Sequence, residues 1–373
     1  MSVNPLLQVK SLGQSVWLDY IQRNILENSE VARMIEQDGL AGMTSNPTIF
    51  EKAINEHDDY DEAIEVLART GTSAIEIYEN LTFEDVRNAA DLFRPVYDKS
   101  NGRDGFVSLE VSPRLAYDTE QTVTEARRLW TALDRPNVMI KVPATPEGLP
   151  AIEQLIVAGI NVNATLLFGL KRYRQVADAF MRGLEARAAQ AKPLDHIASV
   201  ASFFLSRIDV LVDKRLDELA QSGADESANA LRGQTAVACA RLAYQHYQYA
   251  MESSRWQSLS RRGAHSQRLL WASTGTKDPT YSDIKYVEAL IGAETVNTMP
   301  PQTLAAYRDH GKPALRIESE LGEARALPAK LAEFGIDLEA VSEQLETEGV
   351  QKFIDPFDNL LKCLSQRRSE FAC

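Results

Sequence analysis

Residues 138–152, VMIKVPATPEGLPAI, decide the fold of this chain. A short apolar run at 138–142 is followed at once by a helical pattern that opens with Pro146 and Glu147 and closes on Gly159. Proline inside the start and glycine past the end are typical of a helix. A second apolar run, Ile160–Thr165, begins directly after that glycine. A strand, a helix and a strand in this order predict a βαβ unit with parallel strands.

The same alternation extends in both directions along the 373 residues. Eight short strand-like runs are separated by longer helical patterns: Ser15–Asp19, Gly39–Thr44, Phe106–Glu110, Val138–Val142, Ile160–Thr165, Ile197–Phe203, Leu269–Ser273 and Thr295–Met299. Eight βα units favour a closed (β/α)8 TIM barrel over an open doubly wound sheet. We therefore expect an α/β fold in which residues 1–373 form one barrel domain.

Helices beyond the eight units are also predicted. Asp118 and Gln121 have capping-box spacing at the start of a helix that runs to Leu133. Residues 226–256 are predicted to form one long helical stretch before the seventh strand. The sequence from Gly335 to the C-terminus predicts extra helices that form a helical extension of the barrel.

The composition excludes several functional classes. A net charge of −13 argues against nucleic acid as the main partner, because a phosphate backbone requires a basic surface. No run of ~18 apolar residues is present, so we expect neither a membrane span nor a signal peptide. Cys239, Cys363 and Cys373 form no disulfide framework, which favours a cytoplasmic protein. The sequence leaves open whether the protein forms a homo-oligomer.

Polar or ionisable residues stand near the C-terminal ends of the strand-like runs: Asp19, Thr44, Ser45, Asn46, Glu110, Lys141, Asn163, Thr165, Ser202, Ser273 and Asn297. For a single strand, a polar turn on the surface explains such a residue. In a barrel, however, all eight strand ends converge on one face, where active sites lie. Repetition over eight strands therefore predicts a functional site at that face.

Lys141 is the first candidate for chemistry in this set. A lysine that faces inward from a barrel strand among apolar neighbours is desolvated, and desolvation favours the neutral amine that Schiff-base chemistry requires. The alternative is a structural lysine that reaches solvent or pairs with Glu110 or Asp19. The sequence alone leaves both interpretations open.

Asp19 and Glu110 end different strands, and two carboxylates beside a lysine can divide the proton transfers of one reaction. A buried salt-bridge network is the alternative. Asn46, Asn163 and Thr165 would supply neutral hydrogen bonds, although Asn46 before Pro47 is also an ordinary start of a turn.

Arg207 follows the sixth strand at a predicted helix start, where its guanidinium and the exposed helix N–H groups can bind phosphate. An ion pair with Asp209 is the alternative. Lys277 follows the seventh strand, and barrels frequently bind phosphate in the loops after strands seven and eight.

Motifs for cofactors are absent from the sequence. It contains no GxGxxG after a strand and no GxxxxGK[ST]. The five histidines lack HxxxH and HExxH spacing, and the acidic run at 56–62 lacks the pattern of an EF-hand loop. We therefore expect neither a metal nor an organic cofactor.

Five stretches resemble the transaldolase family: GMTSNPTIFEKAI (42–54), VSLEVSPRLAYDT (107–119), VMIKVPATPEGLPAI (138–152), INVNATLLFGLKRY (160–173) and SVASFFLSRID (199–209). The similarity is greatest to the longer bacterial subfamily of these class I aldolase-type barrels, and it extends over most of the chain.

The resemblance implies roles for the residues that match. Lys141 would form the Schiff base with the ketose donor, and Asp19 would exchange the proton of the sugar hydroxyl. Glu110 and Thr165 would hold the catalytic water. Substrate binding would fall to the remaining matches, which are Asn46, Asn163, Ser202, Phe204 and Arg207.

One position departs from the family pattern. Many transaldolases place a second phosphate-binding arginine in the loop after the seventh strand, whereas this chain offers Lys277. Lysine binds phosphate as a point charge rather than as a bidentate fork.

The reaction that the resemblance implies is transfer of a dihydroxyacetone unit from sedoheptulose 7-phosphate to glyceraldehyde 3-phosphate, a step of the pentose phosphate pathway. The partners would be sugar phosphates. A related fructose 6-phosphate aldolase is the alternative enzyme, although those chains are much shorter and carry glutamine where this one has Glu110. A non-catalytic sugar-phosphate-binding barrel is the alternative from another class.

Overall fold

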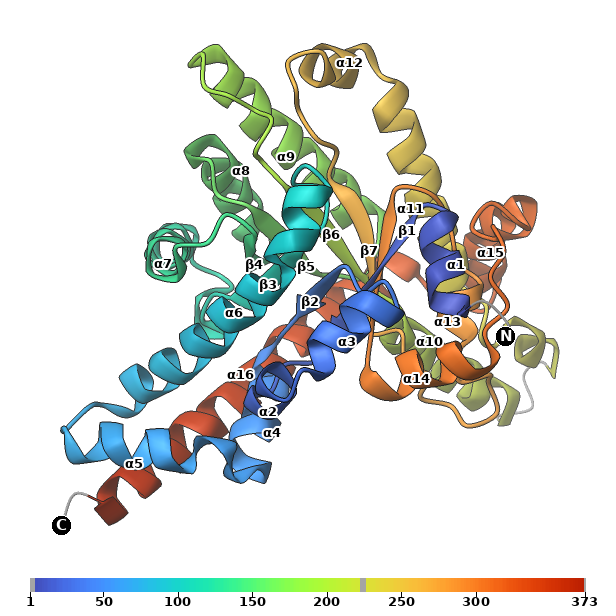
Figure 1. The fold of residues 1–373 in the computed structure, drawn as a ribbon. Helices are drawn as coiled ribbons and strands as arrows, with labels where there is room; N and C mark the ends of the chain where they lie inside the picture. The colour runs from blue at the N-terminus through green and yellow to red at the C-terminus, as the bar shows by residue number, and fades with distance from the viewer. Residues whose placement is uncertain (1–3, 222–225, 372–373) are drawn as a thin grey trace.

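The computed structural model describes residues 4–221 and 226–371. Eight parallel strands close into a barrel in sequence order, and helices surround it (Figure 1). The strands are β1 Gln14–Asp19, β2 Gly42–Thr44, β3 Phe106–Glu110, β4 Val138–Pro143, β5 Val162–Leu167, β6 Ser199–Phe204, β7 Arg268–Ala272 and β8 Thr295–Met299. The predicted (β/α)8 TIM barrel is thus confirmed.

All eight predicted strands are present, with bounds that shift by a few residues. The largest shift is in β2, which begins at Gly42 rather than Gly39. In β5 the strand continues past Thr165 to Leu167, and its register against β6 shifts between Ala164 and Leu167. Leu166 lies in the left-handed region within this irregularity, with φ of 61°. The bulge changes the direction of the chain next to Thr165.

Helices cover the outside of the barrel. The first half of the chain contributes α1 Pro5–Ser11, α2 Arg23–Glu27, α3 Glu30–Gln37, α4 Pro47–Glu56, α5 Asp61–Arg69, α6 Ala74–Lys99, α7 Thr119–Leu133 and α8 Gly148–Ala158. The second half contributes α9 Leu170–Ala189, α10 Ser206–Gln221, α11 Thr235–Glu252, α12 Ser254–Ser260, α13 Lys285–Glu288, α14 Pro301–His310, α15 Leu321–Glu333 and α16 Leu338–Phe371. As the sequence predicted, the Asp118 carboxylate caps α7 by accepting a hydrogen bond from Gln121 N, and Gly159 ends α8.

The long helix predicted for residues 226–256 is interrupted, so that prediction was wrong in its continuity. A 3₁₀ helix at Glu226–Leu231 is followed by α11 and then by α12. Gly233 separates the first two with φ of 70°, and its N–H donates to the Asp213 carboxylate at 2.8 Å. The left-handed glycine interrupts the helix, and its hydrogen bond to a residue distant in sequence holds the chain in that conformation.

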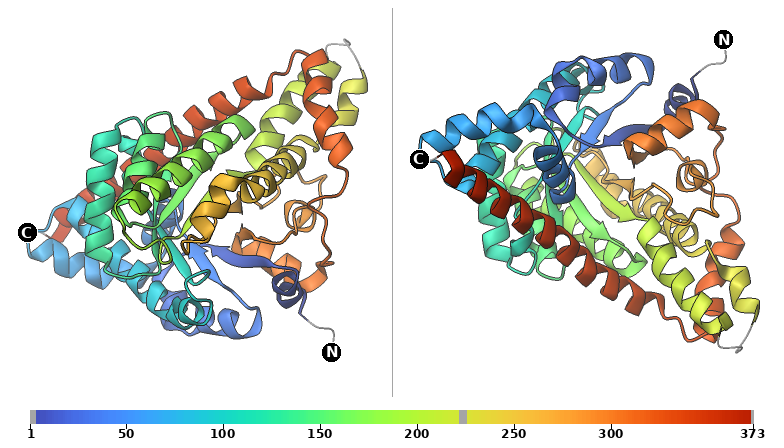
Figure 2. Two further views of the ribbon diagram at one scale, coloured as in Figure 1. Left: turned by 90° about the horizontal axis from the view of Figure 1, so that it is seen from above. Right: turned by 90° about the horizontal axis from the view of Figure 1, so that it is seen from below.

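The C-terminal extension is one long helix rather than several. Figure 2 shows α16 crossing the molecule obliquely, and its C-terminal part lies beside α5. Along its course α16 contacts α4, α6, α10 and β5. Because β5 and the segments that follow β2 and β6 meet at the carboxyl end of the barrel, α16 covers that end.

The amino end of the barrel contains a saturated polar network. The Asp104 carboxylate accepts hydrogen bonds from Ser15 Oγ at 2.6 Å and from Trp17 Nε1 at 3.1 Å. Arg268 Nη2 donates to the same carboxylate at 3.0 Å and to the Arg103 carbonyl oxygen at 2.6 Å. A buried ion pair is tolerated when additional hydrogen bonds satisfy both partners. This end of the barrel therefore serves stability.

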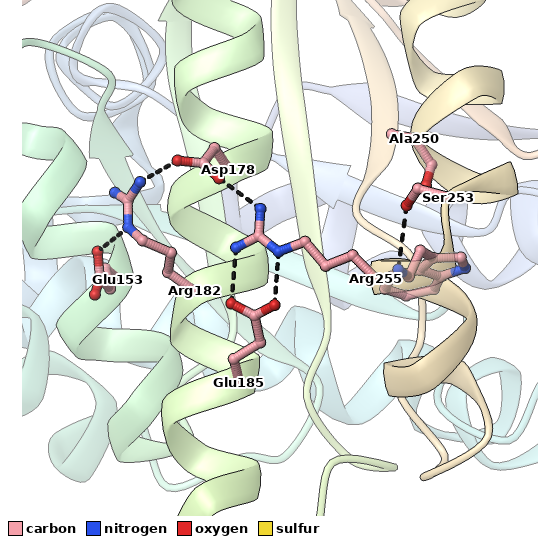
Figure 3. Close-up of polar contacts among 8 residues, drawn as sticks. Glu153, Asp178, Arg182, Glu185, Ala250, Ser253 and Arg255 are labelled. Atoms are coloured by element: carbon pink, nitrogen blue, oxygen red, sulfur yellow. Dashed lines mark hydrogen bonds and ion pairs between the residues drawn. The ribbon is translucent and has the colours of Figure 1, made fainter.

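A charged network ties the outer helices to one another (Figure 3). Arg255 of α12 forms a bidentate pair with Glu185 of α9, at 2.6 and 2.8 Å, and bonds Asp178 at 2.6 Å. Arg182 of α9 joins the same Asp178 to Glu153 of α8. These side chains are half exposed, so each pair contributes modestly, roughly 0–1 kcal/mol. The network fixes α12 just before the chain enters β7.

No helix within residues 4–221 and 226–371 is long and apolar enough to cross a membrane. Cys239 and Cys363 form no disulfide, whereas Cys373 lies outside the described residues.

Close packing inside the barrel leaves no room for a side chain at Gly42. A Cβ there would lie 2.5 Å from Trp17 Cε2 and 2.8 Å from the Phe106 carbonyl oxygen. Gly42→Ala should therefore destabilise the fold by roughly 1–3 kcal/mol, because the core has no space for the methyl group. Urea unfolding monitored by circular dichroism measures this change.

Gly322 is the matched control for Gly42. It lies in α15, a Cβ at this position would meet no heavy atom within 4 Å, and its φ is not positive. Gly322→Ala should be neutral or stabilising by up to ~1 kcal/mol, because alanine favours helix. Equal destabilisation by both substitutions would contradict the packing argument.

Candidate active site

A cavity of about 370 Å³ opens at the carboxyl end of the barrel. Of the ten residues to which the sequence analysis assigned a catalytic or binding role, eight line it: Asp19, Asn46, Lys141, Thr165, Ser202, Phe204, Arg207 and Lys277. They come from six of the eight βα units and meet only because closure of the barrel brings the strand ends together. The two others, Glu110 and Asn163, do not line this cavity; they contact Lys141 and Ser202, which do.

Lys141 projects from β4 and is 4% exposed. Its Nζ donates to the Ser45 carbonyl oxygen at 2.9 Å and lies 3.4 Å from Glu110 Oε2. The register aligns Lys141 with Glu110 of β3 on one side and with Asn163 of β5 on the other. This lysine does not reach solvent, so one of the two structural alternatives is excluded, while the pairing with Glu110 is real.

Glu110 is an underpaired carboxylate. Neither of its oxygens has a hydrogen-bond partner by geometric criteria within the described residues, although Oε2 is in ion-pair range of Lys141. Burial raises the pKa of Glu110, and the charge of Lys141 opposes that shift only in part. A buried acceptor without a partner is costly unless a ligand or water satisfies it. Glu110 is thus prepared to bind a water molecule or to exchange a proton with Lys141.

Asp19 ends β1 and faces the cavity. Thr44 Oγ1 donates its proton to Asp19 Oδ1 at 2.6 Å and lies 2.7 Å from Thr298 Oγ1. A hydroxyl has one proton, so Thr298 donates to Thr44 and the chain of hydrogen bonds ends on the carboxylate. Burial raises the pKa of Asp19, and the hydrogen bond from Thr44 acts against this shift. A buried carboxylate of raised pKa is suited to accept a proton from a bound molecule.

The amide and hydroxyl side chains of the candidate site are buried to different extents around the cavity. Asn163 is fully buried: its Oδ1 accepts from Ser202 Oγ at 2.6 Å, and its Nδ2 donates to Ser108 Oγ at 3.1 Å. Asn46 is the N-cap of α4 and accepts from Ile49 N at 3.0 Å. Thr165 Oγ1 is buried with no hydrogen-bond partner in the described part of the chain. Asn46 therefore combines the predicted turn role with a place on the cavity wall.

Arg207 is one of the cations that line the cavity. It is the second residue of α10, as predicted, and its Cζ lies 5.7 Å from the Phe204 ring. Its Nη1 is buried without a hydrogen-bond partner among the described residues, and burial lowers the pKa of the guanidinium. The alternative pair with Asp209 does not form, because Asp209 binds Lys285 instead. An unpaired buried guanidinium at a helix start is a site for an anion.

Lys277 also lines the cavity, from the loop after β7, and has no hydrogen bond or ion pair inside the described ranges. In a chain with a net charge of −13, two unpaired cations that face one cavity indicate an anionic ligand.

The sequence missed several cavity residues. Phe353 of α16 lies over the site, with its ring 5.8 Å from Lys141 Nζ and 5.9 Å from Arg207 Cζ. It is far from Lys141 along the chain, in a helix of ordinary amphipathic pattern, so no local signal marks it. Lys52 lines the rim from α4.

One predicted strand-end residue lies elsewhere. Thr298 faces the cavity, and alternation along β8 directs Asn297 to the opposite side of the sheet. Asn297 is fully buried there, and neither polar atom of its amide has a partner within the described residues. Because successive side chains of a strand point to opposite faces of the sheet, Asn297 is not part of the site.

Comparison with known proteins identifies the family. The family model described as transaldolase/fructose-6-phosphate aldolase matches residues 16–364. A protein from Nostoc named Transaldolase 2 is 48% identical over 98% of this chain and 97% of its own length. Transaldolases from Thiobacillus denitrificans and Thermobifida fusca are each 49% identical and cover 95% and 98% of this chain, with 97% and 98% of their own lengths aligned. This chain, with its buried lysine beside two carboxylates in a closed barrel, belongs to the transaldolase/fructose-6-phosphate aldolase family.

Proposed function

We propose that this protein is a transaldolase that transfers a dihydroxyacetone unit from sedoheptulose 7-phosphate to glyceraldehyde 3-phosphate, giving erythrose 4-phosphate and fructose 6-phosphate. The observation that carries the proposal is the arrangement of charges in the cavity. A buried Lys141 has Asp19 and Glu110 near it, and the unpaired cations Arg207 and Lys277 face the same space.

Lys141 is proposed to be the covalent residue. Its amine attacks the C2 carbonyl of the ketose, and loss of water from the carbinolamine gives a protonated imine, which is the electron sink. The amine must be unprotonated to attack, and Glu110 at 3.4 Å is placed to accept its proton. The Ser45 carbonyl oxygen at 2.9 Å fixes the direction of the amine.

Asp19 is proposed to act at carbon–carbon cleavage. Asp19 takes the proton of the C4 hydroxyl, and the C3–C4 bond breaks. The electron pair of that bond moves into the imine and gives an enamine, while an aldose phosphate leaves. The acceptor aldose then binds, and the same steps run in reverse. The Thr298–Thr44–Asp19 hydrogen bonds hold the carboxylate in one orientation during both directions.

Glu110 and Thr165 are proposed to hold the water that forms and hydrolyses the imine. Support comes from the two buried acceptors of Glu110 and from the buried hydroxyl of Thr165, none of which has a protein hydrogen-bond partner in the described residues. A water molecule that bonds such groups removes their desolvation cost.

The remaining residues are proposed to bind the sugar phosphate. Arg207 and Lys277 would take the phosphate, with Ser202 and Phe204 beside them. Asn46 would bind a hydroxyl near Lys141. Asn163 would act through Ser202, because its oxygen is already engaged by that hydroxyl.

Transaldolase is favoured over release of free dihydroxyacetone. The family model includes both activities, so membership alone does not separate them. The relatives compared above are named transaldolases, and this chain has a carboxylate at Glu110. We further propose that residues 1–373 form one domain, and the position of Phe353 near Lys141 supports including α16 in it. We also propose that the protein works in the cytoplasm and without a cofactor.

Lys141 should form a covalent adduct with the donor sugar. Incubation with fructose 6-phosphate and borohydride should attach a reduced three-carbon unit to Lys141, because the imine is the species that borohydride reduces. Peptide mass mapping locates the adduct. Lys141→Ala should abolish turnover in a coupled assay with fructose 6-phosphate and erythrose 4-phosphate, while Lys330→Ala on α15 should not. An adduct on another lysine would overturn the assignment.

Asp19→Asn and Glu110→Gln should fail at different steps. Asp19→Asn should still form the imine but stall at cleavage, whereas Glu110→Gln should slow imine formation and hydrolysis. Rapid-quench borohydride trapping distinguishes the two, and identical time courses for both variants would contradict this division of roles.

In the pH profile of kcat, the apparent pKa of the acid limb should lie above the ordinary pKa range of a carboxyl group. Burial raises the pKa of Asp19, and its basic form is the active one, so activity should be lost as pH falls through that raised pKa. The limb should disappear in the residual activity of Asp19→Asn. A limb at the ordinary carboxyl pKa would count against Asp19 as the base.

Arg207 should determine the preference for phosphorylated donors. Arg207→Ala removes a charge-assisted hydrogen bond worth ~1.5–3 kcal/mol, so kcat/KM for fructose 6-phosphate should fall roughly ten- to a hundredfold. The loss for unphosphorylated fructose should be small. Arg182→Ala, which deletes a surface guanidinium from the α8–α9 network, is the control. Equal losses on both donors would remove Arg207 from phosphate recognition.

A further inference from the structure

The loop between β7 and α13, residues 273–284, contains Lys277 near its middle. Lys277 lines the active-site cavity and also a neighbouring cavity of about 560 Å³ that is bordered by α10. Its ammonium has no hydrogen bond or ion pair among the described residues, so the course of the loop determines which region this cation can reach.

The near end of the loop is fixed by the barrel. Ser273 leaves β7 in the left-handed region, with φ of 55°, and its Oγ lies 2.8 Å from Ser206 Oγ at the start of α10. Thr274 is fully buried and donates to the Thr298 carbonyl oxygen at 2.9 Å. The first two residues of the loop are therefore held between β8 and α10.

The far end of the loop is fixed by two carboxylates of α10, Asp209 and Asp213. They are one helical turn apart and are 1% and 5% exposed. Asp213 Oδ2 accepts from Tyr281 OH at 2.8 Å, and Asp209 Oδ2 accepts from Lys285 Nζ at 2.9 Å.

The other oxygen of each carboxylate is also used. Asp209 Oδ1 accepts from Ala236 N at 2.7 Å, and Asp213 Oδ1 accepts from Gly233 N at 2.8 Å. Lys285 Nζ lies 3.8 Å from the centre of the Tyr281 ring, which restricts that ring further. We name Asp209, Asp213, Tyr281 and Lys285 the α10 clamp.

The clamp and the phosphate cation Arg207 are on the same helix. Arg207 occupies the first turn of α10, and the two clamp carboxylates follow it by two and six residues. α10 thus presents one cation directly and holds in place the loop that presents the other. Buried carboxylates are an expensive way to fasten a loop, which favours a role that needs exact geometry.

We propose that the α10 clamp consists of positioning residues that hold Lys277 at a fixed separation from Arg207, so that the two cations bind one phosphate together. This inference rests on the proposed function. It assigns the clamp no contact with substrate: the clamp acts only through Lys277.

A double-mutant cycle tests this proposal. Tyr281→Phe removes one clamp hydrogen bond and keeps the ring, and it is combined with Lys277→Ala in the full-length protein. With fructose 6-phosphate as donor, Tyr281→Phe should raise KM by about three- to tenfold and leave kcat unchanged. With unphosphorylated fructose it should change neither constant.

The decisive comparison is in the Lys277→Ala background. If the clamp acts through Lys277, Tyr281→Phe should have no further effect there. Tyr244→Phe removes a phenol hydrogen bond to the Ala293 carbonyl oxygen, outside the clamp, and should leave the donor preference unchanged. Thermal unfolding of every variant confirms that each one folds.

Two results would overturn the inference. One is an equal loss from Tyr281→Phe with and without Lys277; the other is a Lys277→Ala variant that keeps the full preference for phosphorylated donors. Neither result would affect the proposed function, which would fail instead if the wild type formed no borohydride-trapped adduct on Lys141.

Discussion

Burial of the Lys141 side chain is the constraint on which the site depends. An ammonium or amine removed from water needs partners at hydrogen-bond distance, and β4 can offer none from its own backbone. The neighbouring strand supplies Glu110 in register, and the segment after β2 supplies the Ser45 carbonyl oxygen. These two contacts require β2, β3 and β4 to end at the same level, which is what a closed parallel barrel provides.

The charged groups that we describe at the two ends of the barrel differ in whether they have hydrogen-bond partners. At the amino end, Asp104 and Arg268 satisfy one another and bind Ser15, Trp17 and the Arg103 backbone. At the carboxyl end, Glu110, Thr165 and Arg207 all retain polar atoms that no described residue satisfies. A ligand or water that forms hydrogen bonds with these three groups would remove the cost of leaving them unpaired. Together with the cavity at this end, these groups indicate that the carboxyl end is the functional face.

The sequence was sufficient for the features that repeat locally. The eight strands follow from short apolar runs between helical patterns, and Lys141 followed from a charged residue inside such a run. The interruption at Gly233 was not predicted: a glycine within a helical pattern can be tolerated, and here its left-handed conformation is held by a hydrogen bond to Asp213 in another helix. Asn297 lies in β8 as expected but does not line the cavity, since its neighbour Thr298 has the orientation that faces the cavity. A long-range contact holds the helix interruption at Gly233, and the orientation of Asn297 depends on which residues of β8 point into the barrel.

The placement of Phe353 shows how a distant segment becomes part of the site. Gly349 lies where α16 approaches β5: a Cβ there would come within 3.1 Å of Leu166 and 3.4 Å of Phe168. Leu166 adopts its left-handed conformation in the β5 bulge, so glycine and bulge together let the helix approach the barrel rim closely. One turn later, on the same face, Phe353 reaches Lys141 and Arg207.

The same face of α16 continues past the cavity. One turn beyond Phe353, Phe357 packs edge-on against Tyr78 of α6, with ring centroids 5.3 Å apart. The ring of Phe353 is therefore anchored from both sides, by the glycine contact at β5 and by the aromatic contact at α6. A helix held at two points can keep an apolar ring near Lys141 Nζ, and under the proposed function that ring would limit the access of water to this nitrogen. Control of water is what separates transfer of an enamine to an acceptor from its loss by hydrolysis.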